Sequence, residues 1–427
     1  MIKKILSVFI TSIILLLFSC ENDSALSEDQ KNFFVRYIGD NGNQEAVDIE
    51  LLNDGSFIIL FNTDSDGTNK DFGLANVSQT GDLIWLRTYG DPSLQEVAKD
   101  LSIVPEFQNG FAFIIGYSIL QVNNGDMGVL VTAADGTQLK NVKDAFVNAN
   151  DDLKSVTYNI NDGGVVVTGE TLVGSNKQSV IVRLKPLTNA DFGFYAANES
   201  WGRIDFGGGE DEEMVTLFVN DLSTGLDPYH WFMSTNEIGV GATDFNFYAA
   251  ALDASGIVSK GTRLPDDVND DNDDFLNFVL QEGSNADGIF YSMIGTRQVG
   301  QNLSVQALKI FMPKIGGEAA LNIIGNFSFN GNYRGIGISK IPGGYWFLLK
   351  KEIVVNDEVV TNLSLQRVND VFTPQGTVVD FPSELSVEPA KIKIGENQKI
   401  FVLSTATIGN QRKVQLIKLN RSGQFSN

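Results

Sequence analysis

The sequence predicts an all-β fold, a seven-bladed β-propeller of four-stranded antiparallel blades. Short apolar runs bounded by Gly, Asn and Asp indicate strands joined by tight turns, and long amphipathic helical patterns are absent. Four strands per unit of roughly 50 residues is typical of a propeller, which has about 4–8 blades. One run recurs seven times at intervals of 54 to 66 residues, starting at Phe57, Phe111, Val165, Trp231, Ile289, Tyr345 and Ile400.

The first unit displays all four predicted strands. They fall at 45–49, 53–59, 71–74 and 80–90, separated by turn residues. The unit around Trp231 is the least regular, because it lacks the glycine turn and follows a longer excursion through 187–200.

The last unit offers only three strands, near 391–394, 399–405 and 412–420. Residues 33–39, FFVRYIG, resemble the end of the outer strand of the first unit, 85–90, WLRTYG, yet no strand precedes them. We therefore predict that 33–39 is the fourth strand of the last blade and lies alongside 414–419. Closing the ring in this way pairs strand edges that would otherwise be open to aggregation.

The N-terminus has the pattern of an export signal. Lys3 and Lys4 precede an apolar stretch at 5–18, which is too short to span a membrane, and Cys20 follows. Leu17-Phe-Ser-Cys20 resembles the lipobox of bacterial lipoproteins, which implies an acylated Cys20; a simple signal peptide with a chance cysteine is the alternative. We expect a signal peptide at 1–19, a lipid-anchored polar tether at 20–32 and the propeller at 33–427.

Composition limits the partners. Cys20 is the only cysteine, so the chain has no second thiol for a disulfide. A formal net charge of −22 repels phosphate backbones and anionic headgroups, so we expect no nucleic acid partner. Contact with a membrane should then depend on the acyl chains of Cys20.

The repeats contain Trp-x-Arg-x-Tyr-Gly, then Gln or Glu followed by x-Ala-x-Asp and Ile or Leu, then Asp-Gly-Gly or Asp-Gly-Ser before an apolar strand, clearest in 33–116 and 162–170. They resemble propeller repeats of secreted and lipid-anchored proteins of Bacteroidota. Glu21-Asn22-Asp23 is similar to the acidic signal that exports lipoproteins of that group. The resemblance implies an outer-membrane lipoprotein exposed at the cell surface, and it supplies no catalytic residues.

Few residues suggest a catalytic or metal-binding site. His230 is the only histidine, which excludes histidine-based zinc clusters and Ser-His-Asp triads, and a buried strand residue is the simpler interpretation. Asp64, Asp66 and Asp71 are spaced as weak calcium ligands, although a turn would have the same composition. The segment 78–85 superficially resembles an aspartate box of sialidases, but the aspartate follows the glycine, and a tight turn is favoured.

Acidic residues gather in the segments that join the outer strand of one blade to the inner strand of the next. In a propeller these segments lie on one face, which we therefore predict to be negative and to point away from the tether. The candidates are Asp151, Asp152, Glu210, Asp211, Glu212, Glu213, Asp266, Asp267, Asp270, Asp271, Asp273 and Asp274.

These features predict a protein that is not an enzyme and needs no cofactor, calcium excepted. We expect a lipid-anchored scaffold for a protein partner, or an accessory subunit of an outer-membrane assembly. A glycan-binding or glycan-cleaving propeller of a polysaccharide-uptake system is the first alternative; exposed aromatic clusters or a carboxylate pair about 5–9 Å apart would favour it. A calcium-dependent adhesin is the second.

Overall fold

The computed structural model describes residues 33–39, 42–64, 69–107, 110–120, 125–144, 151–174, 176–190, 192–195, 202–206, 211–224, 227–236, 245–264, 273–285, 287–313, 322–355, 358–381 and 386–425. These residues contain 28 β-strands and two short 3₁₀ helices, Leu222–Thr224 and Glu396–Gln398. Across the ranges just given, no helix is long and apolar enough to cross a membrane. The signal sequence, Cys20 and the tether predicted from the sequence lie outside these residues.

The strands form seven separate four-stranded antiparallel sheets, as predicted. Blade 1 contains β2 (Gln44–Leu51), β3 (Phe57–Thr63), β4 (Asp71–Val77) and β5 (Leu83–Tyr89). Blade 2 contains β6 (Glu96–Phe107), β7 (Gly110–Ile119), β8 (Asp126–Ala133) and β9 (Gln138–Asp144), and blade 3 contains β10 (Asp151–Asn159), β11 (Gly164–Val173), β12 (Asn176–Leu184) and β13 (Arg203–Asp205). Blade 4 contains β14 (Glu212–Val219), β15 (Tyr229–Asn236), β16 (Phe245–Leu252) and β17 (Val258–Leu264).

The remaining blades follow the same order. Blade 5 contains β18 (Asp273–Ser284), β19 (Gly288–Val299), β20 (Asn302–Pro313) and β21 (Asn322–Asn330), and blade 6 contains β22 (Tyr333–Ile341), β23 (Gly344–Val355), β24 (Glu358–Val368) and β25 (Val379–Phe381). Blade 7 contains β26 (Val387–Ile394), β27 (Ile400–Ile408), β28 (Gln411–Leu419) and β1 (Phe34–Ile38). The repeated run found in the sequence is the second strand of every blade.

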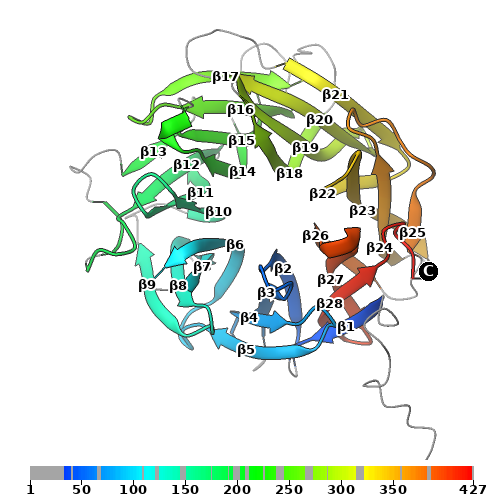
Figure 1. Cartoon of the computed structure of the whole chain (residues 1–427), viewed down its shortest axis with the longest axis horizontal. Helices are drawn as coiled ribbons and strands as arrows, with labels where there is room; N and C mark the ends of the chain where they lie inside the picture. The colour runs from blue at the N-terminus through cyan, green and yellow to red at the C-terminus, as the bar shows by residue number, and fades with distance from the viewer. Residues whose placement is uncertain are drawn as a thin grey trace, which may run out of the picture.

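The ring is closed by the first strand of the chain (Figure 1). β1 pairs antiparallel with β28, with Phe34 opposite Lys418 and Ile38 opposite Val414. The prediction that FFVRYIG completes the last blade is therefore confirmed. Phe34 and Ile38 are buried, whereas Val35 and Tyr37 between them are 37% and 49% exposed, so the closing strand has one packed face and one open face.

The turns lie where the sequence predicts them. The Asp54-Gly55 turn between β2 and β3 is closed by a hydrogen bond from Leu52 N to Ser56 O of 2.8 Å, and Gly55 has φ +78°, a conformation that favours glycine. In the aspartate-box-like segment, Ser78 N donates to Asp82 O at 2.9 Å. That segment is the tight turn before β5.

The apolar core lies between neighbouring blades. Ile58, Leu60 and Phe72 of blade 1 pack with Phe113 and Tyr117 of blade 2. The seam between the last and first blades is packed in the same way, and the rings of Phe57 and Phe401 have centroids 4.3 Å apart. Because second strands such as β3 contribute residues to both blade faces, they are buried along almost their whole length.

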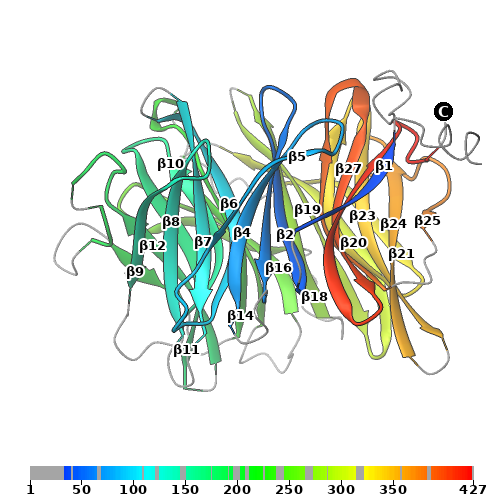
Figure 2. The ribbon, with the colours of Figure 1, turned by 90° about the horizontal axis from the view of Figure 1, so that it is seen from below.

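Seen from the side, the strands of the blades run between the two faces of the ring (Figure 2). Every inner strand begins on one face, which we call the entry face, and the second and third strands of each blade are joined there. On the opposite face the first strand is joined to the second and the third to the fourth, and β1 also begins there, opposite the end of β28. A tether that precedes Phe33 therefore joins the ring on the side away from the entry face.

Candidate functional site in the channel and on the entry face

All seven inner strands carry a β-bulge at the same place. The pairing with the second strand shifts by one residue shortly after the strand begins, for example between Ala46 and Asp48 and between Ala98 and Asp100. The other five inner strands shift at the equivalent position. Bulges bend a strand and redirect the side chain that follows. The residues after the bulge are Asp48, Asp100, Ser155, Thr216, Phe278, Gly337 and Lys391.

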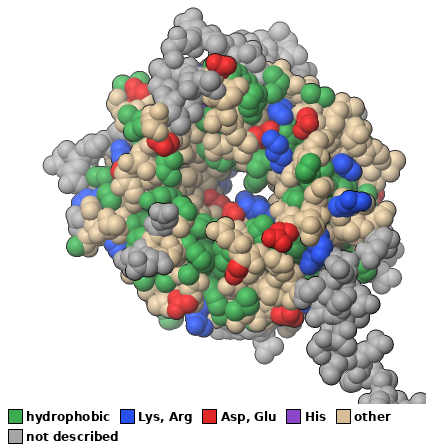
Figure 3. Space-filling view, viewed as in Figure 1, with side chains coloured by type: hydrophobic (Ala, Val, Ile, Leu, Met, Phe, Trp, Pro, Cys, Tyr) green, Lys and Arg blue, Asp and Glu red, His purple; other side chains and the backbone are tan. Residues whose placement is uncertain are grey.

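Three of these residues form a charged cluster in the central channel, which we call the channel cluster: Asp48, Asp100 and Lys391. Lys391 Nζ lies 3.4 Å from Asp48 Oδ2, and Asp48 and Asp100 are hydrogen-bonded to one another. Lys391 Nζ also lies 5.0 Å from the ring centroid of Phe278. Because blades 5 and 7 are not adjacent, that contact crosses the channel, whose opening is bordered by acidic and basic side chains in Figure 3.

The pKa values of the two carboxyl groups in the channel cluster shift in opposite directions. Burial disfavours the charge on Asp48, but Lys391 and Lys393 outweigh burial and lower the pKa of the Asp48 carboxyl. Burial and the negative charge of Asp48 raise the pKa of Asp100 well above its ordinary value. Asp100 therefore keeps its proton to a higher pH than Asp48, and Lys391 pairs with the Asp48 carboxylate. Two carboxyl groups in direct hydrogen-bond contact do not have the separation of about 5–9 Å that glycoside cleavage uses.

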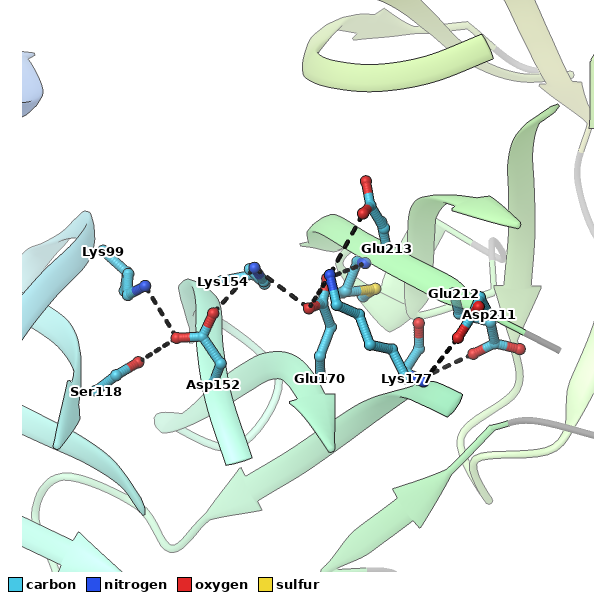
Figure 4. Close-up of polar contacts among 11 residues, drawn as sticks. Lys99, Ser118, Asp152, Lys154, Glu170, Lys177, Asp211, Glu212 and Glu213 are labelled. Carbon is cyan, nitrogen blue, oxygen red and sulfur yellow. Dashed lines mark hydrogen bonds and ion pairs between the residues drawn. The ribbon is translucent and has the colours of Figure 1, made fainter. Parts of the chain in front are cut away.

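A second polar feature, the ion-pair chain, spans blades 2, 3 and 4 (Figure 4). Asp152 accepts a hydrogen bond of 2.8 Å from Ser118 and pairs with Lys99 at 2.9 Å and Lys154 at 3.0 Å. Lys154 also lies 3.3 Å from Glu170. Lys177 continues the chain, 3.8 Å from Glu170 and 3.4 Å from Glu213.

Burial and neighbouring charges together shift the pKa values of the carboxyl groups in the ion-pair chain. Burial opposes the charge on Asp152, but Lys154 and Lys99 outweigh it and lower the pKa of Asp152 to about 2. For Glu170 burial prevails over the attraction of Lys154 and Lys177 and raises the pKa. Alternating charges held in this way link three blades at the mouth of the channel.

Backbone hydrogen bonds also link consecutive blades. In five junctions the residue before the bulge donates its N–H to a polar side chain near the end of the preceding blade's second strand. The donors and acceptors are Ala46 to Thr405 (2.9 Å), Ala98 to Asn62 (2.7 Å), Leu153 to Ser118 (3.0 Å), Met214 to Glu170 (3.1 Å) and Leu276 to Ser234 (2.7 Å). Blade 7 has Pro389 at this position, which has no N–H, and Lys350 instead contacts Glu388 at 2.5 Å.

The described members of the predicted acidic face lie at or beside the starts of β10, β14 and β18, all on the entry face. Most are engaged by the protein itself. Asp151 pairs with Arg203 at 2.8 Å and Asp274 with Arg297 at 2.7 Å, and both carboxylates are buried. Asp211, Glu212 and Asp273 accept backbone N–H groups. Glu210, Asp266, Asp267, Asp270 and Asp271 lie outside the described residues.

The remaining residues singled out in the sequence are buried or make hydrogen bonds within the fold where the structure describes them. His230 is buried, its Nδ1 lies 2.8 Å from the Tyr291 hydroxyl, and burial and Lys260 lower its pKa to about 3. Asp64 accepts hydrogen bonds from the backbone and side chain of Asn43. Asp66 falls outside the described part of the chain, within which no group of three metal-ligating side chains occurs. Trp231 and Trp346 are buried.

Exposed aliphatic side chains lie at turns on both faces, and on the entry face they lie at the tips of the hairpins. Five blades carry them beside the turn between the second and third strands, and we call this set the tip crown: Leu120, Leu172, Val173, Val299, Val354, Val359 and Ile408. Val354 and Val359 are 72% and 65% exposed. The sequence reasoning missed the tip crown, although a valine on each side of a predicted hairpin turn is a readable signal.

The sequence reasoning also missed the channel cluster. Two consecutive units have an aspartate two positions after an alanine, in Gln44-Glu-Ala-Val-Asp48 and Glu96-Val-Ala-Lys-Asp100, and the equivalent position of the last unit is Lys391. Aligning the seven inner strands would have placed these side chains together.

No protein-family model and no curated protein matches this sequence. Solved structures with a similar fold include the WD40 domain of SCAP from fission yeast, 9% identical over 91% of this chain and 98% of that chain, with a TM-score of 0.42. Another is an α-L-arabinanase of Penicillium chrysogenum complexed with arabinobiose, 9% identical over 76% of this chain and 94% of that chain, with a TM-score of 0.45. Propellers support many functions, so no activity is transferred from these likenesses.

Proposed function

We propose that this protein is a non-catalytic, lipid-anchored β-propeller that acts as a scaffold for a protein partner in an outer-membrane assembly. The observation that carries the proposal is the tip crown. Aliphatic side chains that project from separate hairpins of one face gain free energy when a partner covers them, and they have no role in the core.

The charges around the channel complement the tip crown. Protein interfaces combine apolar contacts with polar groups that fix orientation. On the entry face, the ion-pair chain lies at the starts of the inner strands, and the tip crown lies beyond it at the ends of the second strands. A partner that rests on the tips would therefore face an ordered array of paired charges.

The state of the channel cluster supports a role without catalysis. Asp48 and Asp100 contact each other directly and Lys391 pairs with Asp48, so this carboxyl pair lacks the separation that glycoside cleavage uses. The single histidine is held neutral in the core. These groups stabilise the ring.

The proposed location follows from the lipobox-like sequence before Cys20 and from the course of β1. A tether that reaches Phe34 on the face opposite the tip crown leaves the tip crown turned away from the membrane. A partner that lies on the far side of the propeller from the membrane would then meet the entry face.

Affinity purification from gently solubilised envelopes tests the proposal. We expect one protein to co-purify with the wild type and to be lost with the double variant Val354→Ser, Val359→Ser. The matched control is Ile257→Ser, because Ile257 is 64% exposed on the opposite face. Substitutions at such exposed positions change stability by about 0.5 kcal/mol or less. Retention of the same partner by the double variant, or its loss in the control, would refute a role for the tip crown.

A further inference from the structure

A polar pocket lies on the entry face at the seam where the last blade meets the first. Its volume is about 280 Å³, and its walls come from the start of β2, the end of β3, the residue before β4, β6 and the turn between β27 and β28. This volume lies just below the range of about 300–1,000 Å³ that is typical of ligand pockets, so the pocket suits only a small molecule, such as one monosaccharide.

Most charged groups of the pocket wall are already engaged. Both oxygens of Asp64 accept hydrogen bonds from Asn43, at 2.8 and 3.1 Å. The side-chain oxygen of Asn43 in turn accepts the backbone N–H of Arg412 at 3.0 Å. Arg412 Nη1 lies 3.2 Å from one oxygen of Glu45. These contacts fix the pocket across the seam of the ring.

Lys70 is different. Its carbonyl oxygen accepts the backbone N–H of Glu96 at 2.8 Å, which fixes its main chain, but no carboxylate of the described residues lies within ion-pair distance of its ammonium group. The chain has 53 acidic and 31 basic side chains, so a carboxylate partner would be easy to supply. Lys70 is exposed and lines the pocket together with Arg412.

We propose that this pocket binds a small carboxylate that also carries hydroxyl groups, of the class of the uronic acids. Lys70 and Arg412 would bind the carboxylate through charge-assisted hydrogen bonds. Glu45, with one oxygen left by Arg412, and Asn410 at the tip of the turn would bind hydroxyl groups. This inference is independent of the proposed docking of a protein on the tip crown.

Calorimetric titration with three probes, glucuronate, glucose and acetate, at matched ionic strength tests the inference. We expect glucuronate to bind with a Kd of about 1 mM or tighter, and glucose and acetate each to bind at least about tenfold more weakly. Lys70→Met should weaken glucuronate binding by about tenfold or more.

The control is Lys399→Met, which makes the same charge change in the turn before β27 on the opposite face. Three outcomes would overturn the inference: no saturable binding of glucuronate, equal binding of glucose and glucuronate, or equal loss of affinity in the two lysine variants. Circular dichroism of each variant establishes that the fold is intact, so that a loss of affinity reports the pocket.

Discussion

His230 should make the protein lose stability as the pH falls from 7 to 5, because its imidazole is buried. The imidazole is 1% exposed and hydrogen-bonded to Tyr291, and burial and Lys260 lower its pKa to about 3. An unfolded chain has the ordinary histidine pKa of about 6.5. Between these values the unfolded state binds more protons than the folded state, so acid favours unfolding.

The size of the effect follows from the two pKa values. The loss begins near pH 6.5 and continues to about pH 3, with a limiting slope of about 1.4 kcal/mol per pH unit. Between pH 7 and pH 5 the free energy of unfolding should fall by about 2 kcal/mol through this residue alone. His230 is the only histidine in the sequence, so no second imidazole contributes.

The assay is urea unfolding at pH 7, 6 and 5 for the wild type and for His230→Gln, whose amide retains a hydrogen bond to Tyr291. Carboxyl groups such as Asp100 titrate in both proteins and cancel in the difference. The stability of the wild type relative to the variant should fall by about 2 kcal/mol from pH 7 to pH 5. Parallel pH profiles would show that His230 is protonated in the folded state, and the reasoning would be wrong.

Other predictions concern the closure, the channel and the anchor. Phe34→Ala should lower the free energy of unfolding by about 3–5 kcal/mol and Val35→Ala by less than about 1 kcal/mol, because only Phe34 is buried; equal losses in urea unfolding would contradict the closure. Lys391→Met should destabilise by about 2 kcal/mol or more, and adding Asp48→Asn should restore part of that loss; additive effects in the double-mutant cycle would exclude their pairing. Cys20→Ala should release the protein from the membrane fraction, and retention there would exclude a lipid anchor at this residue.

The seven units and the strand that closes the ring could be predicted from the sequence because both depend on local patterns. A Gly-containing turn and an apolar strand recur in all units except the one around Trp231, and the last unit lacks a fourth strand, which Phe34 and its neighbours supply. Each strand had only one available position once the number of blades was known. The pairing of β1 with β28 followed from that count.

The burial and the ion pairs of the acidic residues could not be predicted in the same way. Asp151 and Asp274 look like loop carboxylates in the sequence, but they begin inner strands and are buried against Arg203 and Arg297. Arg203 lies 52 residues from Asp151 in the chain. Such pairs depend on the register of distant strands and on the bulges, which composition does not encode.

Site-specific photo-crosslinking in the cells that make the protein tests the central claim most directly. A photoreactive residue would replace Val354, Val299 or Val173 in the tip crown, and Ile160 or Ile257 on the opposite face as controls. We predict that the three tip positions yield an adduct with the same protein and that the two controls do not. Adducts of the tips with unrelated proteins, or the same adduct from both faces, would contradict a partner that docks on the entry face.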